Sequence, residues 1–593
     1  MFYLFFLVKN LILAQIYFIM NRIVFFLFFI GITPLFACTN LIVTKGASKD
    51  GSVMITYAAD SHRRYGYLFH YPAANHKPGD MVDIIHYENG KFLGQIPEVS
   101  HTYNVVGFMN EHQVAIGETT FGGLDSLQFQ SNALLDYGSL MKLALQRAKT
   151  AREAIKIIVE LVEKYGYAGS GESFSISDKN EAWIMEIIGK GNYEKGAVWV
   201  AMRIPDGFVS GHANQARITT FPFQKKNDWN NLKQDVYHSP DVISFARKHG
   251  FYKGSDATFS FSDVYNPITF DGARFCDARV WAFFRKISNE IKNNYAYQAY
   301  ACGNLQYDSK MISGAINPNK FCSNRLPLWV KPDELIDISL IMETMRDHFE
   351  DTPLDMRDGI GAGPWHCPYR WRPMTFEVDS VEYVHERAIA TQQTGFSFVA
   401  QSRHWLNDVV GGIFWFGVDD ADGCVYAPMY SSISKIPSSY SVANGSMIEW
   451  SDSSAFWIFN LVTNWCYTRY DLIHPEIELY QRQLENKYFE EIKEIDSVAM
   501  SLLKEDPALA LNYLTQYSCT TGNDLVKNWR IFFQYLFMKY MDGNVKESEN
   551  RKLLDNGNNK GIPKKISFPG YGDDWLRLMM MNTGPRYKVI YKD

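Results

Sequence analysis

Cys38 is the residue of this chain with the clearest chemical potential, because it stands at the end of a hydrophobic leader. The apolar segment 23–32 follows Arg22 and leads to Leu35-Phe36-Ala37, a pattern typical of a secretory signal at its cleavage site. Cleavage after Ala37 would make Cys38 the first residue of the mature chain. A terminal cysteine carries a nucleophilic thiol and an α-amino group with a pKa of roughly 8, so it can supply both nucleophile and base.

Two other interpretations of Cys38 stay open at this point. The segment 35–38 approximates a bacterial lipoprotein signal, in which the cysteine is acylated on sulfur and nitrogen and both reactive groups are blocked. Phe36 is bulkier than the small residue usual at that place. Alternatively, Cys38 is an ordinary buried thiol in a strand, since cysteine is among the most buried residue types.

The leader itself has two possible starts. Met20 precedes Asn21-Arg22 and looks like the natural initiator, so residues 1–19 are read as an upstream start-site artefact; otherwise the signal is unusually long. Both readings predict residues 1–37 as the signal peptide. No later segment is apolar over the roughly 20 residues that a membrane span needs. We therefore expect an exported protein, periplasmic or extracellular, with no membrane contact after cleavage unless Cys38 is lipidated.

The elements that must position this cysteine begin at the cysteine itself. Residues 39–44 and 53–57 are predicted as two strands of a hairpin, joined by a turn that contains Gly46 and Asp50-Gly51. Two amphipathic helices are predicted at 132–149 and 151–165, with Thr150 as a cap and Gly166 as a stop. Further strands are predicted at 174–176, 182–188, 197–204 and 208–211. Separate runs of strands and helices favour a layered α+β fold.

The hairpin sequence carries a specific resemblance. Cys38-Thr39-Asn40, the turn 45–52 and Ala59-Asp60-Ser61 together resemble the start of the C69 dipeptidase family, whose members have a processed N-terminal cysteine. Similar segments follow in the family's order at 108–120, 181–186, 199–207 and 212–217, and weaker similarity, which includes 273–279, extends to about residue 470. The resemblance implies the four-layer αββα sandwich of the N-terminal nucleophile hydrolases, a class that includes the related bile-salt hydrolases and penicillin V acylases.

The resemblance also nominates residues for a site around Cys38. Asn214 is the leading oxyanion donor, and Asp60 would orient the α-amine. Glu118 or Thr119 could line the opposite wall, and the forked guanidinium of Arg203 could bind a substrate carboxylate. Each has a structural alternative: a turn or cap for Asn214, a turn for Asp60 and a salt bridge for Arg203. His212 is expected to be a structural histidine.

One departure from the family pattern concerns the charge near the thiol. Tyr57 occupies the place, three residues before Asp60, where members often carry an arginine that would lower the thiol pKa. Arg63, Arg64 or Arg203 could replace it, and the sequence does not choose among them.

Composition is compatible with a large exported enzyme. Hydrophobic residues make up 46% of the chain, and loss of Lys9 and Arg22 with the leader takes the formal charge from −6 to −8. This acidic balance shows no footprint of a nucleic-acid partner. A homo-oligomer is compatible with the sequence.

The eight cysteines match no zinc signature, so we expect no catalytic metal and no cofactor. Cys302 and Cys322 form a plausible loop-closing disulfide. The Gly-rich stretch 350–373 is predicted as an irregular loop rather than a phosphate cradle. Residues 419–423 are predicted as a solvated turn, because a calcium loop would need a glutamate at its twelfth position.

The chain is predicted to continue past the peptidase-like region 38–470 into a mostly helical C-terminal region, 471–593. Residues 475–541 have helical patterns with charged faces that we expect to be solvated. Residues 542–565 are polar and predicted to be a flexible connection.

We therefore expect an exported cysteine peptidase that hydrolyses dipeptides through a thioester on Cys38, with its α-amine as base. An amidase of N-acyl amino acids or bile-salt-like amides is the first alternative, since the same catalytic residue serves both. A lipid-anchored binding protein without catalysis is the second.

Overall fold

The computed structural model describes residues 37–308, 321–371 and 373–591. The chain divides into two compact units, residues 1–36 and residues 37–593. The predicted signal peptide, apart from its last residue, lies outside the described residues. In the described part of the chain, no helix is long and apolar enough to cross a membrane.

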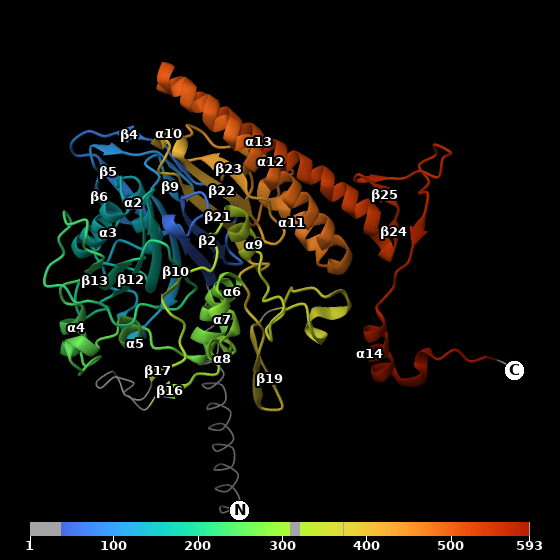
Figure 1. The fold of residues 1–593 in the computed structure, drawn as a ribbon, viewed down its shortest axis with the longest axis horizontal. Helices are drawn as coiled ribbons and strands as arrows, with labels where there is room; N and C mark the ends of the chain where they lie inside the picture. The colour runs from blue at the N-terminus through green and yellow to red at the C-terminus, as the bar shows by residue number, and fades with distance from the viewer. Residues whose placement is uncertain (1–36, 309–320, 372, 592–593) are drawn as a thin grey trace, which may run out of the picture. The chain divides into compact units, whose positions relative to one another are not determined.

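The first of two large sheets contains Cys38. Its strands run in the order β18-β14-β1-β2-β21-β22-β23, and neighbouring strands are antiparallel (Figure 1). Strand β1 pairs with β2 so that Cys38 lies opposite Ala59, which confirms the predicted hairpin. The strands are β1 Ala37–Val43, β2 Val53–Asp60, β14 Val209–His212, β18 Trp329–Val330, β21 Thr394–Ser402, β22 Gly412–Val418 and β23 Ala427–Tyr430.

The second sheet follows the order β15-β13-β12-β11-β10-β9-β8-β3 and is also antiparallel. It contains the strands predicted near 174–176, 182–188 and 197–204. Its members are β3 His70–Tyr71, β8 Val105–Val106, β9 Met109–Asn110, β10 Ala115–Gly122, β11 Gly171–Ser177, β12 Ala182–Gly189, β13 Ala197–Arg203 and β15 Val236–His238.

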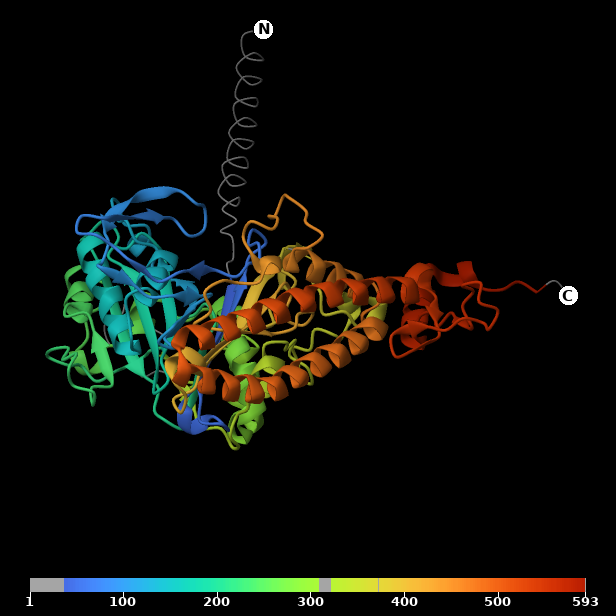
Figure 2. The same ribbon diagram turned by 90° about the horizontal axis from the view of Figure 1, so that it is seen from above.

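The two sheets pack face to face, with β1 and β2 against β10 and β11. The approach is close at Gly117 on β10, where a Cβ would lie 3.1 Å from the Thr56 carbonyl oxygen. Helices α2 (Tyr137–Leu145) and α3 (Ala151–Tyr165) cover the second sheet (Figures 1 and 2). Helix α11 (Ala455–Cys466) packs on β22 of the first sheet. The fold is therefore α+β, with two antiparallel sheets and helices packed against each of them.

The two predicted helices before β11 differ in how well the sequence sets their ends. Helix α3 begins and ends as predicted, because the Thr150 side chain accepts a hydrogen bond from the Glu153 amide and Gly166 takes a φ of 79°. Helix α2 is shorter than the predicted 132–149. Its first turn is set by Asp136, whose side chain accepts from the Ser139 amide.

Smaller elements connect these layers. The remaining helices are α4 Val242–Lys248, α5 Phe261–Tyr265, α6 Ala278–Ile287, α7 Asn289–Asn293, α8 Tyr295–Ala301, α9 Ile338–Thr344, α10 Asp408–Gly411 and α14 Asp573–Thr583. Two-stranded ribbons are formed by β4 Ala74–Asn75 with β7 His101–Thr102, β5 Met81–Ile85 with β6 Phe92–Pro97, β16 Tyr307–Asp308 with β17 Phe321–Cys322, and β19 Thr375–Val378 with β20 Val381–Val384.

The predicted C-terminal helices are confirmed as α12 (Tyr470–Glu505) and α13 (Pro507–Tyr540). Asp506 caps α13 by accepting a hydrogen bond from the Ala508 amide. The expectation of solvated charged faces is wrong for Glu485, which is buried and lies 2.6 Å from Arg346. Charged residues of α12 thus anchor the helix to the rest of the unit.

The segment 542–565, predicted as a flexible connection, contains the short strands β24 Val545–Lys546, β25 Ser548–Glu549 and β26 Lys552–Leu553; β24 pairs with β27 Ile566–Ser567. Its flexibility stays a prediction. Two smaller expectations need correction. The turn 419–423 is buried rather than solvated, because Asp422 accepts hydrogen bonds from His474 at 2.8 Å and Tyr470 at 2.9 Å. Cys302 and Cys322 are both free. The described residues 350–371 of the predicted loop are irregular as expected, apart from a short 3₁₀ segment, Ile360–Trp365.

Candidate active site

Cys38 lies near the start of β1, with 5% of its surface exposed. Its backbone nitrogen donates a hydrogen bond to Asn214 Oδ1 at 2.8 Å, and its carbonyl oxygen accepts one from Arg279 Nη1 at 2.5 Å. Both polar atoms of its backbone are thus held by side chains from distant parts of the sequence. This fixes the position of the nitrogen that would become the α-amine after cleavage at Ala37.

The sulfur of Cys38 faces the space between the two sheets. It lies 3.9 Å from the Tyr57 hydroxyl and 3.8 Å from Glu118 Oε1, and the Tyr57 hydroxyl donates a hydrogen bond to the same carboxylate. Burial raises the pKa of the Cys38 thiol well above its ordinary value, and the charges of Glu118 and Asp60 raise it further. In this uncleaved chain the thiol is therefore protonated and needs a base to react.

Asn214 follows β14 in a left-handed backbone conformation, with a φ of 61°, which asparagine tolerates better than most residues. Its Oδ1 accepts from both the Cys38 nitrogen and Arg279 Nη2, each at 2.8 Å. Its Nδ2 donates to the Thr120 carbonyl at 2.7 Å. The Nδ2 group carries two hydrogens, and among the described residues the Thr120 carbonyl accepts one of them. The predicted oxyanion role of Asn214 depends on that hydrogen and stays a prediction.

Asp60 lies at the end of β2, where it pairs in register with Ala37. Its buried carboxylate accepts hydrogen bonds from Arg387 Nη2 at 2.8 Å and Thr394 Oγ1 at 2.5 Å. Burial raises the pKa of Asp60, against the lowering effect of Arg387. Asp60 is thus close enough to Cys38 to influence its charge, and its carboxylate is engaged by an arginine.

Two arginines that sequence reasoning did not select, Arg279 and Arg387, supply the positive charge near the thiol. Arg279 is fully buried at the start of α6 and, besides Cys38 and Asn214, donates to Thr39 Oγ1 at 2.7 Å. Burial lowers the pKa of Arg279 to about 10, and the neighbouring charge of Arg387 contributes. Only the similarity of segment 273–279 to the C69 family pointed toward Arg279.

Arg63, Arg64 and Arg203, which could replace the arginine that the family often carries at the position of Tyr57, have different partners in the structure. Arg64 lies 2.7 Å from Glu88. Arg203, on β13, lies 2.7 Å from Asp235 and is partly exposed, which is the salt-bridge alternative for this residue. The Arg63 backbone nitrogen donates a hydrogen bond to Ser61 Oγ at 3.2 Å.

Of the two candidates for the opposite wall, Glu118 reaches the sulfur and Thr119 points elsewhere. Thr119 Oγ1 and Ser175 Oγ each lie 2.7 Å from a ring nitrogen of His212. Burial lowers the pKa of His212 to about 3, so the ring is neutral. This geometry agrees with the structural role expected for His212.

A second carboxylate accompanies Glu118. Burial raises the pKa of Glu118 to about 7. Burial also raises the pKa of Glu172 well above its ordinary value, and the charge of Glu118 raises it further. Two buried carboxyl groups in such contact favour a shared proton over two charges. In the described part of the chain, no group of three or more His, Cys, Asp or Glu residues is arranged to hold a metal ion.

A profile of peptidase family C69 matches residues 65–483. The chain belongs to peptidase family C69. This C69 peptidase is therefore a hydrolase, and the matched region runs from the loop after β2 into α12.

Curated proteins similar to this C69 peptidase include a probable dipeptidase from Latilactobacillus sakei, 25% identical over 68% of this chain and 76% of that protein. A probable dipeptidase from Salmonella dublin is 22% identical over 68% of this chain and 83% of its own length. A probable dipeptidase B from Streptococcus pyogenes serotype M1 is 22% identical, covering 71% and 77% respectively.

Proposed function

We propose that this C69 peptidase is an exported cysteine dipeptidase that hydrolyses dipeptides through a thioester on Cys38. Removal of residues 1–37 would release the α-amine on which the mechanism depends. The proposal is supported by the dipeptidase names of the relatives and by the compact unit that begins at Ala37, one residue before Cys38. The finer fold we propose for it is the four-layer αββα sandwich of N-terminal nucleophile hydrolases.

The observation that carries the proposal is the pair of contacts at Cys38: its nitrogen on Asn214 Oδ1 and its sulfur beside Glu118. Held at Asn214, the free amine would take the thiol proton as sulfur attacks the scissile carbonyl carbon. The C–N bond then breaks, and the amine returns the proton to the departing amino acid. Water attacks the thioester with the same amine as base, which releases the second product and restores the thiol.

The negative oxygen formed during both attacks needs hydrogen-bond donors. We propose the second Nδ2 hydrogen of Asn214 as one donor, since its amide is fixed by Thr120 and Arg279. Arg279 would keep the Cys38 carbonyl in place while the residue becomes a chain end. These roles use groups already held within hydrogen-bond distance, so little reorganisation is required.

A substrate panel with blocked termini tests the function. A dipeptidase must recognise an ammonium and a carboxylate on either side of one bond, so free dipeptides should be the best substrates. N-acetylation or C-amidation should lower kcat/KM at least about tenfold, equivalent to roughly 1.4 kcal/mol of transition-state binding. Faster hydrolysis of N-acyl amino acids or bile-salt-like amides than of any dipeptide would instead establish the amidase alternative.

A further inference from the structure

Glu118 is a buried carboxylate beside the Cys38 sulfur. The thiol donates a hydrogen bond to Glu118 Oε1, with 3.8 Å between sulfur and oxygen, and the Tyr57 hydroxyl donates to the same oxygen. Hydrogen bonds of catalytic groups are often long without substrate and tighten around it. The thiol proton is therefore already directed at a carboxylate, which is the arrangement that a general base needs.

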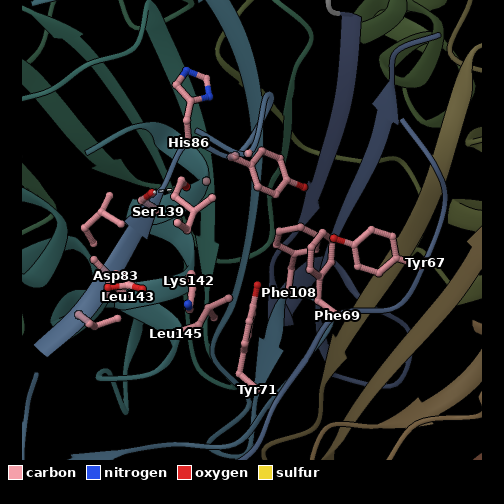
Figure 3. A pocket seen from close by; sticks show the side chains of 17 residues that line it. Tyr67, Phe69, Tyr71, Asp83, His86, Phe108, Ser139, Lys142, Leu143 and Leu145 are labelled. Atoms are coloured by element: carbon pink, nitrogen blue, oxygen red, sulfur yellow. Dashed lines mark hydrogen bonds between the residues drawn. The ribbon is translucent and has the colours of Figure 1, made fainter. Parts of the chain in front are cut away.

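Tyr57 is fixed in a direction that holds this carboxylate in place. Its ring packs edge-on against Phe108, Phe396 and Phe398, at 5.8, 5.6 and 5.8 Å between centroids. Phe108 also lines the cavity of about 280 Å³ shown in Figure 3, whereas Tyr57 is not among the lining residues. The ring cannot turn without displacing these neighbours, so its hydroxyl stays directed at Glu118.

Glu172 accompanies Glu118 on the neighbouring strand β11. It pairs in register with Thr120, two positions after Glu118, so the two glutamates are diagonal neighbours on one face of the sheet. Glu172 Oε1 accepts from Thr120 Oγ1 at 2.7 Å, while Oε2 of each glutamate is buried without a partner among the described residues. One proton between these two oxygens satisfies both, and it leaves Glu118 able to accept another proton.

The α-amine of the processed chain is poorly suited to take the thiol proton at neutral pH. With a pKa of roughly 8 it is mostly an ammonium ion at pH 7, which has no lone pair to accept a proton. The Cys38 nitrogen already acts as a hydrogen-bond donor, to Asn214 Oδ1 at 2.8 Å. Its arrangement thus suits a group that gives a proton to the departing amino acid.

We propose that Glu118 is the catalytic residue that accepts the thiol proton when Cys38 attacks, and that Tyr57 is the positioning residue that holds it there. The inference rests on the proposed dipeptidase function and refines one step of it, since the thiol proton goes to Glu118 instead of the amine.

The proton transfers then balance over the two halves of the reaction. As the S–C bond forms, the thiol proton passes to Glu118, and the α-ammonium gives a proton to the leaving nitrogen as the C–N bond breaks. In the second half, the neutral amine takes a proton from the attacking water. The C–S bond breaks, and Glu118 returns its proton to the sulfur.

The electrostatic surroundings of Glu118 agree with such a role. Burial raises the pKa of Glu118 to about 7, and the Tyr57 hydrogen bond opposes that rise. A base transfers protons most efficiently when its pKa lies near the working pH. The titratable and charged groups that act on Glu118 are Cys38 on β1, Tyr57 on β2, Glu172 on β11, Tyr137 on α2, and Arg64, Tyr87, Glu88 and Tyr167 in connecting segments.

The pH dependence of kcat/KM for a free dipeptide tests the assignment. In the wild type, kcat/KM should fall at acidic pH, because a protonated Glu118 cannot take the thiol proton. Glu118→Gln keeps the size and an acceptor oxygen but cannot accept a proton, so it should lose at least about 100-fold in kcat/KM together with this acidic limb. Tyr57→Phe should move the limb to higher pH, because the carboxylate loses a donor.

Glu186→Gln is the matched control. Glu186 is buried on β12 of the same sheet, and burial raises its pKa to about 7 as well. Its carboxylate accepts from the Arg217 and Ile218 amides. This variant should keep the acidic limb of the wild type.

Alkylation of Cys38 by iodoacetamide gives a readout without a peptide substrate, followed by mass spectrometry of the peptide that begins at Cys38. If Glu118 only adds negative charge beside the sulfur, its removal lowers the thiol pKa and alkylation becomes faster. If Glu118 accepts the thiol proton, alkylation of Glu118→Gln at pH 7 should be at least about tenfold slower than that of wild type.

The outcomes separate this role from the activity. Wild-type kcat/KM with an unchanged acidic limb in processed Glu118→Gln, faster alkylation of that variant, or loss of the limb in Glu186→Gln refutes the role of Glu118 and leaves the dipeptidase function standing. If processed wild-type enzyme cleaves no dipeptide, the proposed function is refuted, and the alkylation rates still decide whether Glu118 takes the thiol proton.

Discussion

Asn214 Oδ1 accepts a hydrogen bond from the Cys38 nitrogen at 2.8 Å, although the two residues are 176 positions apart in the chain. The contact is possible because β14 pairs directly with β1, so the residue two positions after His212 reaches the start of β1. The nitrogen that would serve as the catalytic base is therefore positioned before any cleavage occurs.

The first prediction concerns the mature N-terminus. Because the mechanism needs a free amine, protein exported by a native-like host should begin Cys38-Thr39-Asn40 without modification. Intact mass and N-terminal sequencing measure this. A diacylglyceryl adduct on Cys38 would support the lipid-anchored alternative, and a start several residues later would contradict the mechanism.

The second prediction concerns the nucleophile. Cys38→Ser should remain folded and lose at least about 100-fold in kcat, since a hydroxyl is a weaker nucleophile than a thiol at this position. Cys519→Ser, which removes a partly exposed thiol of α13, is the matched control and should keep full activity. Near-wild-type turnover by processed Cys38→Ser protein would show that another group carries the reaction.

The third prediction separates the two roles of Asn214. Asn214→Ala should lower kcat by roughly 10² if its amide donates to the oxyanion. Asn214→Asp keeps an oxygen for the Cys38 nitrogen and Arg279 but removes the donor, so it should lose a similar factor. Full activity of Asn214→Asp would mean that the residue only positions the amine.

The fourth prediction concerns Arg279. Its guanidinium reaches Cys38, Thr39 and Asn214 at once, which one ammonium group cannot do. Arg279→Lys should lower kcat about tenfold and reduce the free energy of unfolding by about 1–3 kcal/mol, because buried acceptors lose their donors. Arg203→Lys alters a partly exposed ion pair and should change the free energy of unfolding by less than about 0.5 kcal/mol. Equal effects of the two substitutions would contradict the positioning role.

The fifth prediction is a pH dependence of stability. The folded-state pKa of Glu118 is raised to about 7 from 4.5, so the folded protein binds more protons than the unfolded chain between these values. Stability must therefore fall as pH rises from about 4.5 to about 7. Glu118→Gln removes this pH-dependent contribution. As pH rises from 5 to 8, the free energy of unfolding of Glu118→Gln should therefore increase by about 2 kcal/mol relative to that of wild type, measured by denaturant unfolding. If the two proteins differ in free energy of unfolding by the same amount at pH 5 and at pH 8, the raised pKa of Glu118 is contradicted.

The sequence by itself determined the local elements and the family. Two short apolar runs around a Gly-containing turn specify the β1–β2 hairpin, and the caps at Thr150 and Gly166 specify the limits of α3. These features depend on residues close together in the chain. The motif that begins at Cys38 also led to the correct family.

Only the tertiary structure decided which charged groups surround Cys38. Arg279 contacts Cys38 from 241 positions further along the chain, and Arg387 contacts Asp60 from 327 positions further along. No local sequence pattern marks such partners. Burial likewise depends on the packing of whole layers, which is why the acidic turn at 419–423 was predicted to be solvated and is buried instead. Local elements depend on neighbouring residues. The charges around Cys38 depend on residues far apart in the chain, Arg279 on α6 and Arg387 in the segment before β21, which meet only in the folded protein.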